Sequence, residues 1–336
     1  MKGQTIRDVA AAAGVSTATV SRALAPDSTG RVSEKTRLRV SLAVKKLGYR
    51  PNQMARSLKT RSTRTVAIIA PELSNDFFMD LAEGVERVLD AQGYTMLISS
   101  SANSVEEERK RISVLTDRMV DGMVVIPAGA QGKHLKAIAR RGFPLVLVDR
   151  LVEGIDLDAV LSDNEGGAFD LTGRLLSDGF KRIVFVGGNN VISNARERFS
   201  GFSRALRQAG IRTEPEWIRL AGMGVEDGYQ GMDTMLKSPQ TLEALVAVNS
   251  LVHLGMERRL LEWTREGRKL PPVVIAAFDE TRYTPFLPAC RYTAAQDAVS
   301  IGEKAGQRIL ERISLKKQNR KTGSRIIRIP ITIIRH

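Results

Sequence analysis

The sequence has almost none of the residues that build disulfides and soft-metal sites. Cys290 is the only cysteine, and the three histidines, His134, His253 and His336, lie far apart along the chain. A disulfide framework and a cysteine-based metal site are therefore excluded, and the histidines lack the spacing of metal ligands. We expect neither a metal nor a cofactor.

Long apolar runs are missing as well. No stretch of 18 or more apolar residues occurs, and no apolar signal-type segment follows Met1. These absences predict a cytoplasmic protein with no membrane partner. At 336 residues the chain is too long for one typical domain, and it is long enough for a core in two lobes.

Sequence motifs of common enzyme classes are also lacking. Gly187 and Gly188 follow an expected strand, but the chain contains no G-x-G-x-x-G, no P-loop lysine and no G-x-S-x-G turn. Two adjacent glycines after a strand are more often a tight turn than a nucleotide site. We therefore expect no catalytic residues.

Charge of one sign is concentrated at the two ends of the chain. Residues 1–64 contain 14 lysines and arginines against three acidic residues, and residues 304–336 contain ten against one. Residues 65–303 contain 27 against 33. A basic N-terminal segment of this size suits contacts with nucleic-acid phosphates. The C-terminal basic run, from Lys316 to Arg328, is interpreted as a solvated loop and strand edge.

Residues 5–24 predict two short helices joined by a turn. Thr5 and Asp8 are spaced as a capping box that begins the first helix. Gly14 supplies the left-handed residue that ends this helix, and Ser16 caps the second one. The pattern is typical of a helix-turn-helix that binds DNA.

The outward face of the second helix is short and polar, so it can approach base edges closely. An arginine there can bind both acceptors of a guanine. The alternative is an alanine-rich helical hairpin that belongs to a core. The positions that we expect to face DNA are Thr5, Ser16, Thr17, Ala18, Thr19, Ser21 and Arg22.

A third helix is expected over residues 34–47, capped by Ser33 and ended by Gly48. The candidates for its buried side are Leu38, Leu42, Val44 and Leu47. Pro51 then interrupts the chain, residues 52–58 can form one or two helical turns, and a polar linker follows. We therefore expect a DNA-binding domain over residues 1–50, a hinge helix and linker over 51–64, and a larger domain over 65–336.

From Thr65 onward, short apolar runs alternate with helical stretches. This alternation predicts an α/β fold with parallel sheets covered on both faces. Two such series indicate two doubly wound lobes with a ligand cleft at the carboxyl ends of the strands. The expected strands are Val66–Ala70, Tyr94–Ser99, Met123–Ile126, Leu145–Val148, Ile183–Val186, Leu245–Val248, Val273–Phe278 and a last one over 326–334. The expected helices lie near 76–92, 105–118, 132–141, 164–178, 196–209, 226–236, 251–266 and 297–313.

Distinct short motifs occur in order along the whole chain. In the head they are residues 5–24, Val32-Ser33, the run from Leu47 to Asn52 and the run from Ala55 to Leu58. In the larger region they are Leu73–Phe78, Val120–Gly122, Leu147–Arg150, Ser162–Asn164, Arg196–Phe202, Ala277–Glu280 and Gln296. Together these motifs resemble the lactose repressor family of bacterial transcription regulators. The resemblance implies a periplasmic-binding-protein-like fold in which the lobes exchange chain near residues 161 and 294.

The resemblance also implies the roles of individual residues. The second helix would enter the major groove, and the hinge would contact DNA through Asn52, Ala55, Arg56 and Leu58, with Leu58 as an apolar wedge in the minor groove. The effector cleft would be lined by Phe77, Phe78, Asp149, Arg196, Arg198, Asn249, Asp279 and Gln296. Such side chains can bracket the hydroxyls of a sugar while an aromatic ring packs on it.

Several alternatives remain open from the sequence alone. Asp149 and Asp279 could cap loops, and Arg198 could pair with Glu197 on the surface. Asn249 is followed by Ser250, where most members have aspartate. The nearby arginines suit a sugar acid or a sugar phosphate, and a neutral sugar is equally arguable.

The function that the resemblance implies is a ligand-controlled transcriptional repressor of carbohydrate genes. It would bind a pseudo-palindromic double-stranded operator as a homodimer. No leucine heptad for a tetramer follows Ile331. The competing function is a transport-type sugar-binding protein, which the lobes alone would permit.

Overall fold

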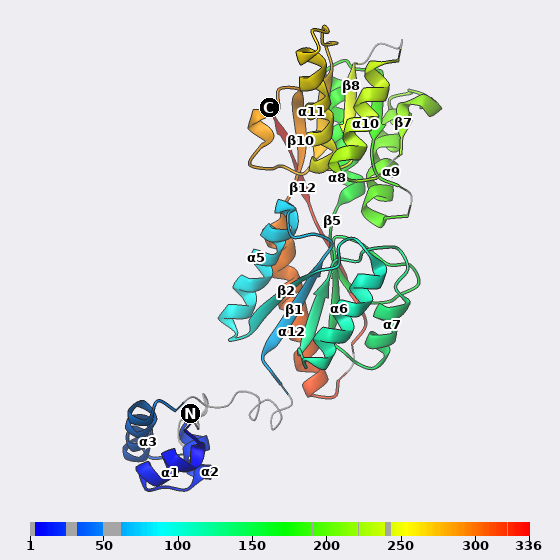
Figure 1. Cartoon of the computed structure of the whole chain (residues 1–336). Coiled ribbons are helices and arrows are strands. Elements are labelled where there is room, and N and C mark those ends of the chain that lie inside the picture. The colour runs from blue at the N-terminus through cyan, green and yellow to red at the C-terminus, as the bar shows by residue number, and fades with distance from the viewer. Residues whose placement is uncertain are drawn as a thin grey trace. The chain divides into compact units, whose positions relative to one another are not determined.

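The computed structural model describes residues 4–24, 32–49, 62–189, 191–220, 222–238, 243–320 and 322–336. The chain divides into two compact units, Met1–Thr63 and Arg64–His336, which we call the head and the effector unit (Figure 1). In the described residues, no helix has the length and apolar composition needed to cross a membrane.

The head contains three described helices, α1 (Ile6–Ala13), α2 (Thr17–Ala23) and α3 (Glu34–Leu47). The Asp8 carboxylate accepts hydrogen bonds from the backbone N–H and the hydroxyl of Thr5, and these bonds hold the pKa of Asp8 below its usual range. Gly14 has a φ of 61° and ends α1. The hydroxyl oxygens of Ser16 and Ser33 accept from backbone N–H groups in the first turns of α2 and α3.

The buried face of α3 differs from the expected one. Leu38 and Leu42 are 63% and 59% exposed, whereas Val40 and Ala43 are buried against α1 and α2. Two residues correspond to about 200° of rotation around a helix, so placing Val40 in the core turns both Leu38 and Leu42 outward. The prediction was correct for Val44 and Leu47, which pack on this core.

The first lobe of the effector unit is a six-stranded parallel sheet with helices on both faces (Figure 1). Alternate residues of β1 separate the two sides of the core. Val66, Ile68 and Ala70 contact α5 and α12, whereas Ala67 and Ile69 lie in the cluster with α6 and α7. The elements are β1 (Thr65–Ala70), α5 (Asp76–Ala91), β2 (Thr95–Ser100), α6 (Val105–Asp117), β3 (Gly122–Val125), α7 (Lys133–Arg140), β4 (Leu145–Val148), β5 (Asp158–Ser162), α12 (Ala298–Lys317) and β11 (Ile326–Ile329).

The second lobe repeats this arrangement. Its strand order, β12-β10-β9-β8-β6-β7, corresponds to the order β11-β5-β4-β3-β1-β2 of the first lobe. One difference is that β12 runs antiparallel to β10, whereas β11 is parallel to β5. The elements are α8 (Asn164–Ser177), β6 (Ile183–Val186), α9 (Ser193–Gln208), β7 (Ile218–Arg219), α10 (Val225–Leu236), β8 (Ala244–Ala247), α11 (Ser250–Arg265), β9 (Val274–Phe278), β10 (Cys290–Gln296) and β12 (Ile331–Arg335), with short 3₁₀ turns at Pro215–Trp217 and Thr284–Phe286.

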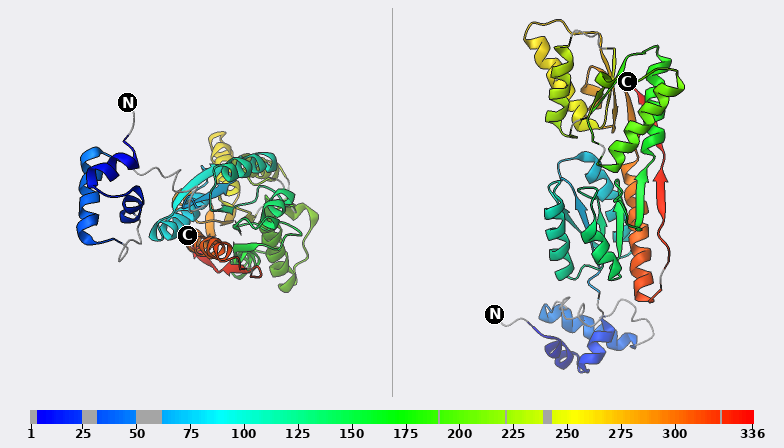
Figure 2. Two further views of the ribbon diagram at one scale, coloured as in Figure 1. Left: turned by 90° about the horizontal axis from the view of Figure 1, so that it is seen from below. Right: turned by 90° about the vertical axis from the view of Figure 1, so that its right-hand side faces the viewer.

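The chain passes between the lobes three times. The crossings follow β5 at Asp163, β10 at Asp297 and β11 at Pro330, and the last two are visible at the long helix α12 and the final strands in Figure 2. The single last strand expected over 326–334 is therefore two strands, one in each lobe. The strands β5, β7 and β10 were not among the expected ones.

Glycines allow pairs of helices to pack with their backbones almost in contact. A Cβ atom at Gly228 in α10 would lie 2.0 Å from the carbonyl oxygen of Val252, and one at Gly255 in α11 would lie 1.9 Å from that of Val225. Gly84 and Gly302 have the same relation in the pair α5 and α12. The close packing of these two helix pairs, one in each lobe, therefore requires glycine at the points of contact.

Candidate functional site

The outward face of α2 is accessible in the head. Thr17, Ala18, Ser21 and Arg22 are exposed, while Val20 and Ala23 are buried. The Nε atom of Arg22 donates to the carbonyl oxygen of Ala18 at 3.3 Å, so the side chain lies along its own helix. The core of the head thus leaves a small polar surface on α2, as a helix that enters the major groove requires.

The other predicted DNA contacts fall into two groups. Ser16 and Thr19 hydrogen-bond to each other at the start of α2, with 2.9 Å between their hydroxyl oxygens, and Thr5 is bonded to Asp8 at the start of α1. Asn52, Ala55, Arg56 and Leu58 lie outside the described residues.

The effector unit contains a cavity of about 300 Å³ between its two lobes. It lies at the carboxyl ends of the strands of both sheets, where ligand sites occur in open α/β folds. Residues from both lobes line it: Glu72, Asn75, Phe77, Phe78, Asn103, Asp149, Arg150, Asn194, Arg198, Met223, Gly224, Asp227, Asn249, Leu251, Asp279 and Gln296. Seven of the eight residues expected at an effector cleft are brought together here, and only Arg196 is not among them.

Asp149 and Asp279 occupy equivalent positions in the two lobes. Asp149 follows β4 with a φ of 64°, and Asp279 follows β9 with a φ of 71°. This left-handed conformation is uncommon for residues other than glycine, although aspartate tolerates it better than most. The equivalent turns of the two lobes therefore each place a carboxylate in the lining of the cavity.

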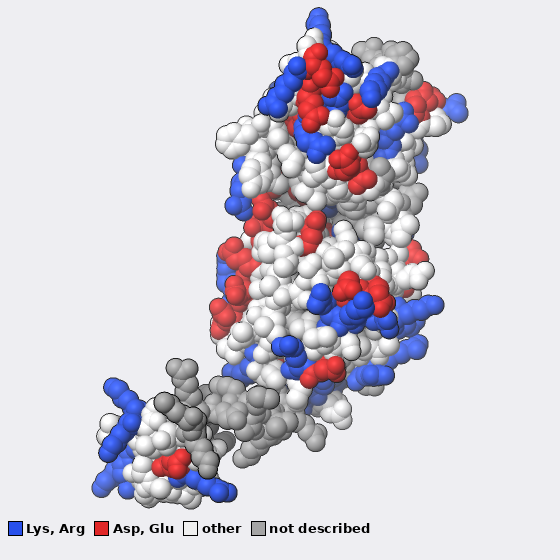
Figure 3. All heavy atoms as spheres, in the orientation of Figure 1, with Lys and Arg blue, Asp and Glu red and all other residues white. Residues whose placement is uncertain are grey.

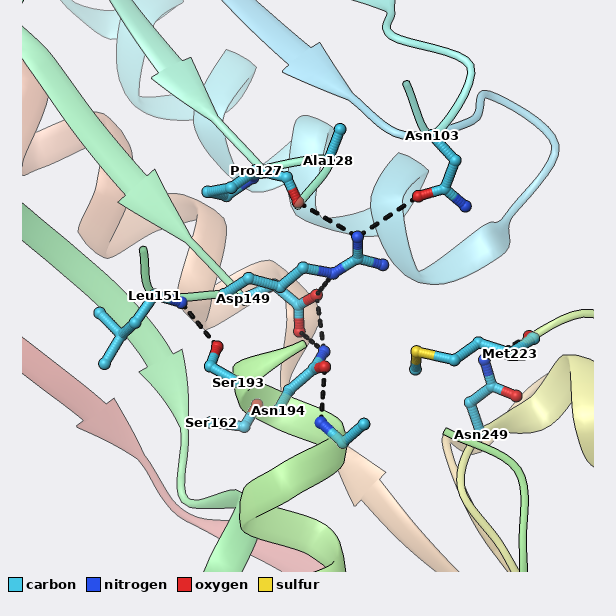
Figure 4. A network of polar contacts seen from close by, with 12 residues as sticks. Asn103, Pro127, Ala128, Asp149, Leu151, Ser162, Ser193, Asn194, Met223 and Asn249 are labelled. Atoms are coloured by element: carbon cyan, nitrogen blue, oxygen red, sulfur yellow. Dashed lines mark hydrogen bonds and ion pairs between the residues drawn. The ribbon is translucent and has the colours of Figure 1, made fainter. Parts of the chain in front are cut away.

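Each of these carboxylates is held by side chains of the cavity wall. Both oxygens of Asp149 accept from Nδ2 of Asn194, at 3.1 and 3.0 Å (Figure 4). Asp279 accepts from Nε2 of Gln296 at 2.5 Å and from the backbone N–H of Ser250 at 3.2 Å. Burial raises the pKa of Asp149, although Arg150 and Arg198 act in the opposite direction.

Arg198 is a buried residue rather than a surface one. Its Nε donates to Asn164 at 2.8 Å, its Nη1 donates to the carbonyl oxygen of Val248 at 2.7 Å, and its guanidinium lies 4.1 Å from the centre of the Phe278 ring. Burial lowers its pKa, against the opposing effect of Asp279 and Asp149. The alternative pairing with Glu197 does not occur, because Glu197 forms its ion pair with Arg328.

Arg196 lies elsewhere. Its side chain is 47% exposed, and its Nη1 is 3.1 Å from the carboxylate of Glu153. The helix explains this difference, because Arg196 and Arg198 are two positions apart, about 200° around α9, so their side chains point to nearly opposite faces. Arg196 links the lobes from outside the cavity.

The sequence placed Arg150 near the cleft without naming it as a site residue, and it missed several other cavity residues. Arg150 donates from Nη1 to the carbonyl oxygen of Pro127 at 3.1 Å and to Asn103 at 3.4 Å (Figure 4). Asn194 could have been found, because it precedes Arg198 by one helical turn and so shares its face of α9. The others, including Glu72 and Asp227, are on loops or helix starts that no periodicity in the sequence marks.

Serine at position 250, where most family members have aspartate, has a defined structural consequence. Asn249, and not Ser250, caps α11, because its Oδ1 accepts from the backbone N–H of Val252 at 2.9 Å. The hydroxyl of Ser250 instead donates to Asp279 at 3.3 Å. A second carboxylate at this position would face Asp279, so serine lowers the negative charge at this end of the cavity.

Comparison with known proteins identifies the family. The model described as bacterial regulatory proteins, lacI family, matches residues 5–52, and the model described as periplasmic binding proteins and sugar binding domain of LacI family matches residues 63–336. The chain belongs to the LacI family.

Two relatives and one solved structure illustrate this membership. The transcriptional regulator RegA of Clostridium saccharobutylicum is 31% identical over 93% of both chains. The transcriptional repressor CytR of Escherichia coli is 32% identical over 96% of this chain and 93% of its own length. The Lac repressor dimer bound to operator and the anti-inducer ONPF has the same fold, with a TM-score of 0.81, 21% identity and coverage of 99% and 98%.

Membership of the LacI family decides between the competing functions. The chain is a DNA-binding transcriptional regulator with a ligand-binding effector unit, and the α/β fold with a helix-turn-helix head is confirmed. The transport-type alternative is wrong, because the match to regulatory proteins covers the head itself.

Proposed function

We propose that this LacI-family protein is a dimeric repressor whose effector is a neutral polyhydroxylated ligand, a sugar or a sugar-containing compound of similar size. The observation that carries the proposal is the charge of the inter-lobe cavity. Four carboxylates line it, those of Glu72, Asp149, Asp227 and Asp279, against the two guanidiniums of Arg150 and Arg198.

Both arginines already donate hydrogen bonds to acceptors of the protein itself. Arg198 donates to Asn164 and Val248, and Arg150 donates to Asn103 and Pro127 while its Nε lies 3.4 Å from Asp149. A phosphate or carboxylate ligand would need these donors and would approach an excess of negative charge. A polyol meets no such barrier, because hydroxyl groups donate to carboxylates and accept from amides.

The aromatic residues of the cavity suit the same class of ligand. Phe77 and Phe78 come from the start of α5, and their rings meet edge to face with centroids 5.6 Å apart. A ring face at the wall can pack on the apolar side of a sugar while the polar groups fix its orientation. We therefore assign the effector-binding role to the seven predicted residues of the cavity, and add Asn194 and Arg150.

The proposed mechanism couples the cavity to the DNA-binding face of α2. The ligand contacts both lobes, so it favours one relative pose of the lobes, and that pose determines whether two heads can bind two half-sites. Coupling of this kind is reciprocal, so operator DNA must change ligand affinity by the same factor. We assign no catalytic step and place this regulator in the cytoplasm.

A thermal-shift screen tests the ligand class. Neutral sugars and nucleosides should raise the melting temperature of the protein, since a ligand of the folded state stabilises it by RT ln(1 + [L]/Kd). Sugar phosphates and sugar acids at the same concentration should give no shift. A shift confined to the anionic ligands would refute the charge argument.

A substitution in α2 tests the DNA-binding role. We expect Arg22→Ala to weaken binding to the operator by about 1–3 kcal/mol, as expected when a bidentate bond to a base is removed. Binding to random DNA should change much less. An equal loss of affinity on both DNAs would make Arg22 a phosphate contact instead.

A further inference from the structure

One edge of the first lobe collects basic side chains. The strands β1 to β4 begin there and the helices α6, α7 and α12 end there, on the side of the sheet opposite the effector cavity. Arg64, the first residue of the effector unit, lies at the start of β1 and so at this edge. We call this surface the linker edge, and its exposed cations are Arg64, Arg118, Arg140, Arg141, Lys316, Lys317 and Arg320.

Contacts with two aromatic rings show that these cations come together from distant parts of the chain. The Nζ of Lys316 lies 5.4 Å from the centre of the Phe143 ring, two residues after Arg141. Arg64 and Lys317 flank Tyr94, at 6.0 and 5.8 Å from its ring centre. Space-filling spheres of Lys and Arg gather along the lower border of the lower lobe, with fewer acidic ones among them (Figure 3).

The linker edge differs from other charged surfaces of this lobe in how its cations are paired. On α6, Arg109 pairs with Glu106 and Lys110 pairs with Glu107, both at 2.8 Å. Arg118, Arg140, Arg141 and Lys316, in contrast, form no ion pair with any residue that the structure describes. The same edge contains the acidic residues Asp90, Asp117, Asp121 and Asp156, which the seven exposed cations outnumber. A surface of this kind can bind an anionic partner without first breaking internal pairs.

Chain connectivity indicates which anion that is. Thirteen peptide steps join Tyr49 to Ser62, and an extended chain spans at most about 3.5 Å per residue, or about 45 Å in all. Duplex DNA bound to the head is therefore tethered within about 45 Å of chain from Ser62, beside the linker edge. We propose that the linker edge contacts the phosphates of the duplex that flanks the operator. This inference rests on DNA binding by the head.

The C-terminal basic run is then more than a solvated loop and strand edge. Part of that run is structural, since Arg328 pairs with Glu197 and the backbone N–H of Arg325 donates to Asp158. Lys316, Lys317 and Arg320 are the part that faces outward.

A matched pair of triple variants tests the proposal. The linker-edge variant is Arg140→Gln, Arg141→Gln and Lys316→Gln. The control is Arg207→Gln, Arg265→Gln and Lys269→Gln, which removes the same charge from exposed positions of the second lobe. The measurement is the Kd for an operator selected from random DNA, in a long duplex and in one trimmed to the operator, at several salt concentrations.

The expected result is confined to one variant and one duplex. The linker-edge variant should bind the long duplex about 5- to 30-fold more weakly at low salt. The slope of log K against log [salt] should fall by about 0.9 for each phosphate that the variant no longer neutralises. On the trimmed duplex the linker-edge variant should bind with the affinity of the wild type. The control variant should bind both duplexes with the affinity of the wild type.

Other results overturn the proposal. Equal affinity of the linker-edge variant and the wild type on the long duplex would do so, and the head would remain the only DNA-binding surface. An equal loss of affinity in both triple variants would show an effect of net charge alone. If the wild type itself selects no operator, the repressor function fails together with this inference.

Discussion

Asn194 and Asp149 connect the two lobes inside the effector cavity. The Nδ2 atom of Asn194, at the start of α9, donates to both carboxylate oxygens of Asp149, which follows β4 (Figure 4). Close to this pair, the hydroxyl of Ser193 accepts from the backbone N–H of Leu151 at 2.7 Å. The lobes therefore meet along one wall of the cavity through groups that also face the ligand.

The substitution Asp149→Asn should weaken ligand binding at least tenfold while leaving the fold as stable as the wild type, or more stable, at pH 7. The reason is that burial raises the pKa of Asp149 above its ordinary value of 3.8, so its ionised form is unfavourable in the folded state. The folded state then binds the proton more tightly, and the stability of the wild type falls as the pH rises from about 4 through the raised pKa. Isothermal calorimetry and urea unfolding at several pH values measure both effects.

The control for this prediction is Asp149→Ala. Alanine tolerates the φ of 64° poorly, so this variant should lose stability where asparagine does not. A flat difference in unfolding free energy between the wild type and Asp149→Asn across this pH range would contradict the assignment.

Arg198→Lys should destabilise the effector unit by about 3 kcal/mol, because a lysine cannot bond to both Asn164 and Val248 and leaves a buried polar group unpaired. Chemical denaturation monitors the change. Arg204→Lys on the same helix is the matched control, since Arg204 is about half exposed and should change stability by less than about 0.5 kcal/mol. Equal effects at the two positions would rule out a special role for the buried guanidinium.

Arg196→Ala should change ligand affinity by less than about twofold. Its partner Glu153 is 70% exposed, and exposed ion pairs contribute about 0–1 kcal/mol. Calorimetry with the ligand that the screen identifies provides the measurement, and Arg198→Ala in parallel shows the size of a true cavity effect. A large drop in affinity for Arg196→Ala would restore it to the effector site.

Gly255→Ala should lower the free energy of unfolding by about 1–3 kcal/mol, because the new Cβ would lie 1.9 Å from the carbonyl oxygen of Val225 and would push α10 and α11 apart. Gly173→Ala in α8 is the opposite case. Its Cβ would meet nothing within 4 Å, so alanine should stabilise the helix by about 0.5–1 kcal/mol. Thermal melts of the two variants should therefore move in opposite directions.

Local signals in the sequence were sufficient for the helix-turn-helix and for most of the two lobes. The caps at Thr5, Ser16 and Ser33 and the left-handed glycines after α1 and α3 act within a few residues, so their positions are visible in the sequence. The strands β5 and β10 were not visible. Each ends in a polar residue, and each is enclosed on its other side by a distant strand, β5 by β11 and β10 by β12.

Some features of the cavity could likewise be predicted from the sequence, and others could not. Asp149 and Asp279 were identified from family motifs, but their bonds to Asn194 and Gln296 depend on how segments of the chain that are not neighbours in the sequence meet. Arg196 and Arg198 were both expected at the cleft because they belong to one motif, but only Arg198 lines the cavity. Their spacing places them on nearly opposite faces of α9. Which face is buried depends on how the whole helix packs against the lobe, and Arg198 is on the buried face.

The final strands have a consequence for the order in which the protein is made. Residues 326–335 supply an edge strand to both sheets, and α12 covers one face of the first lobe although it follows β10 of the second. Neither lobe is therefore complete until residues 326–335 have been synthesised. The head precedes both lobes in the chain and packs its own core. During translation, a domain built to hold DNA can therefore form before the domain that regulates it.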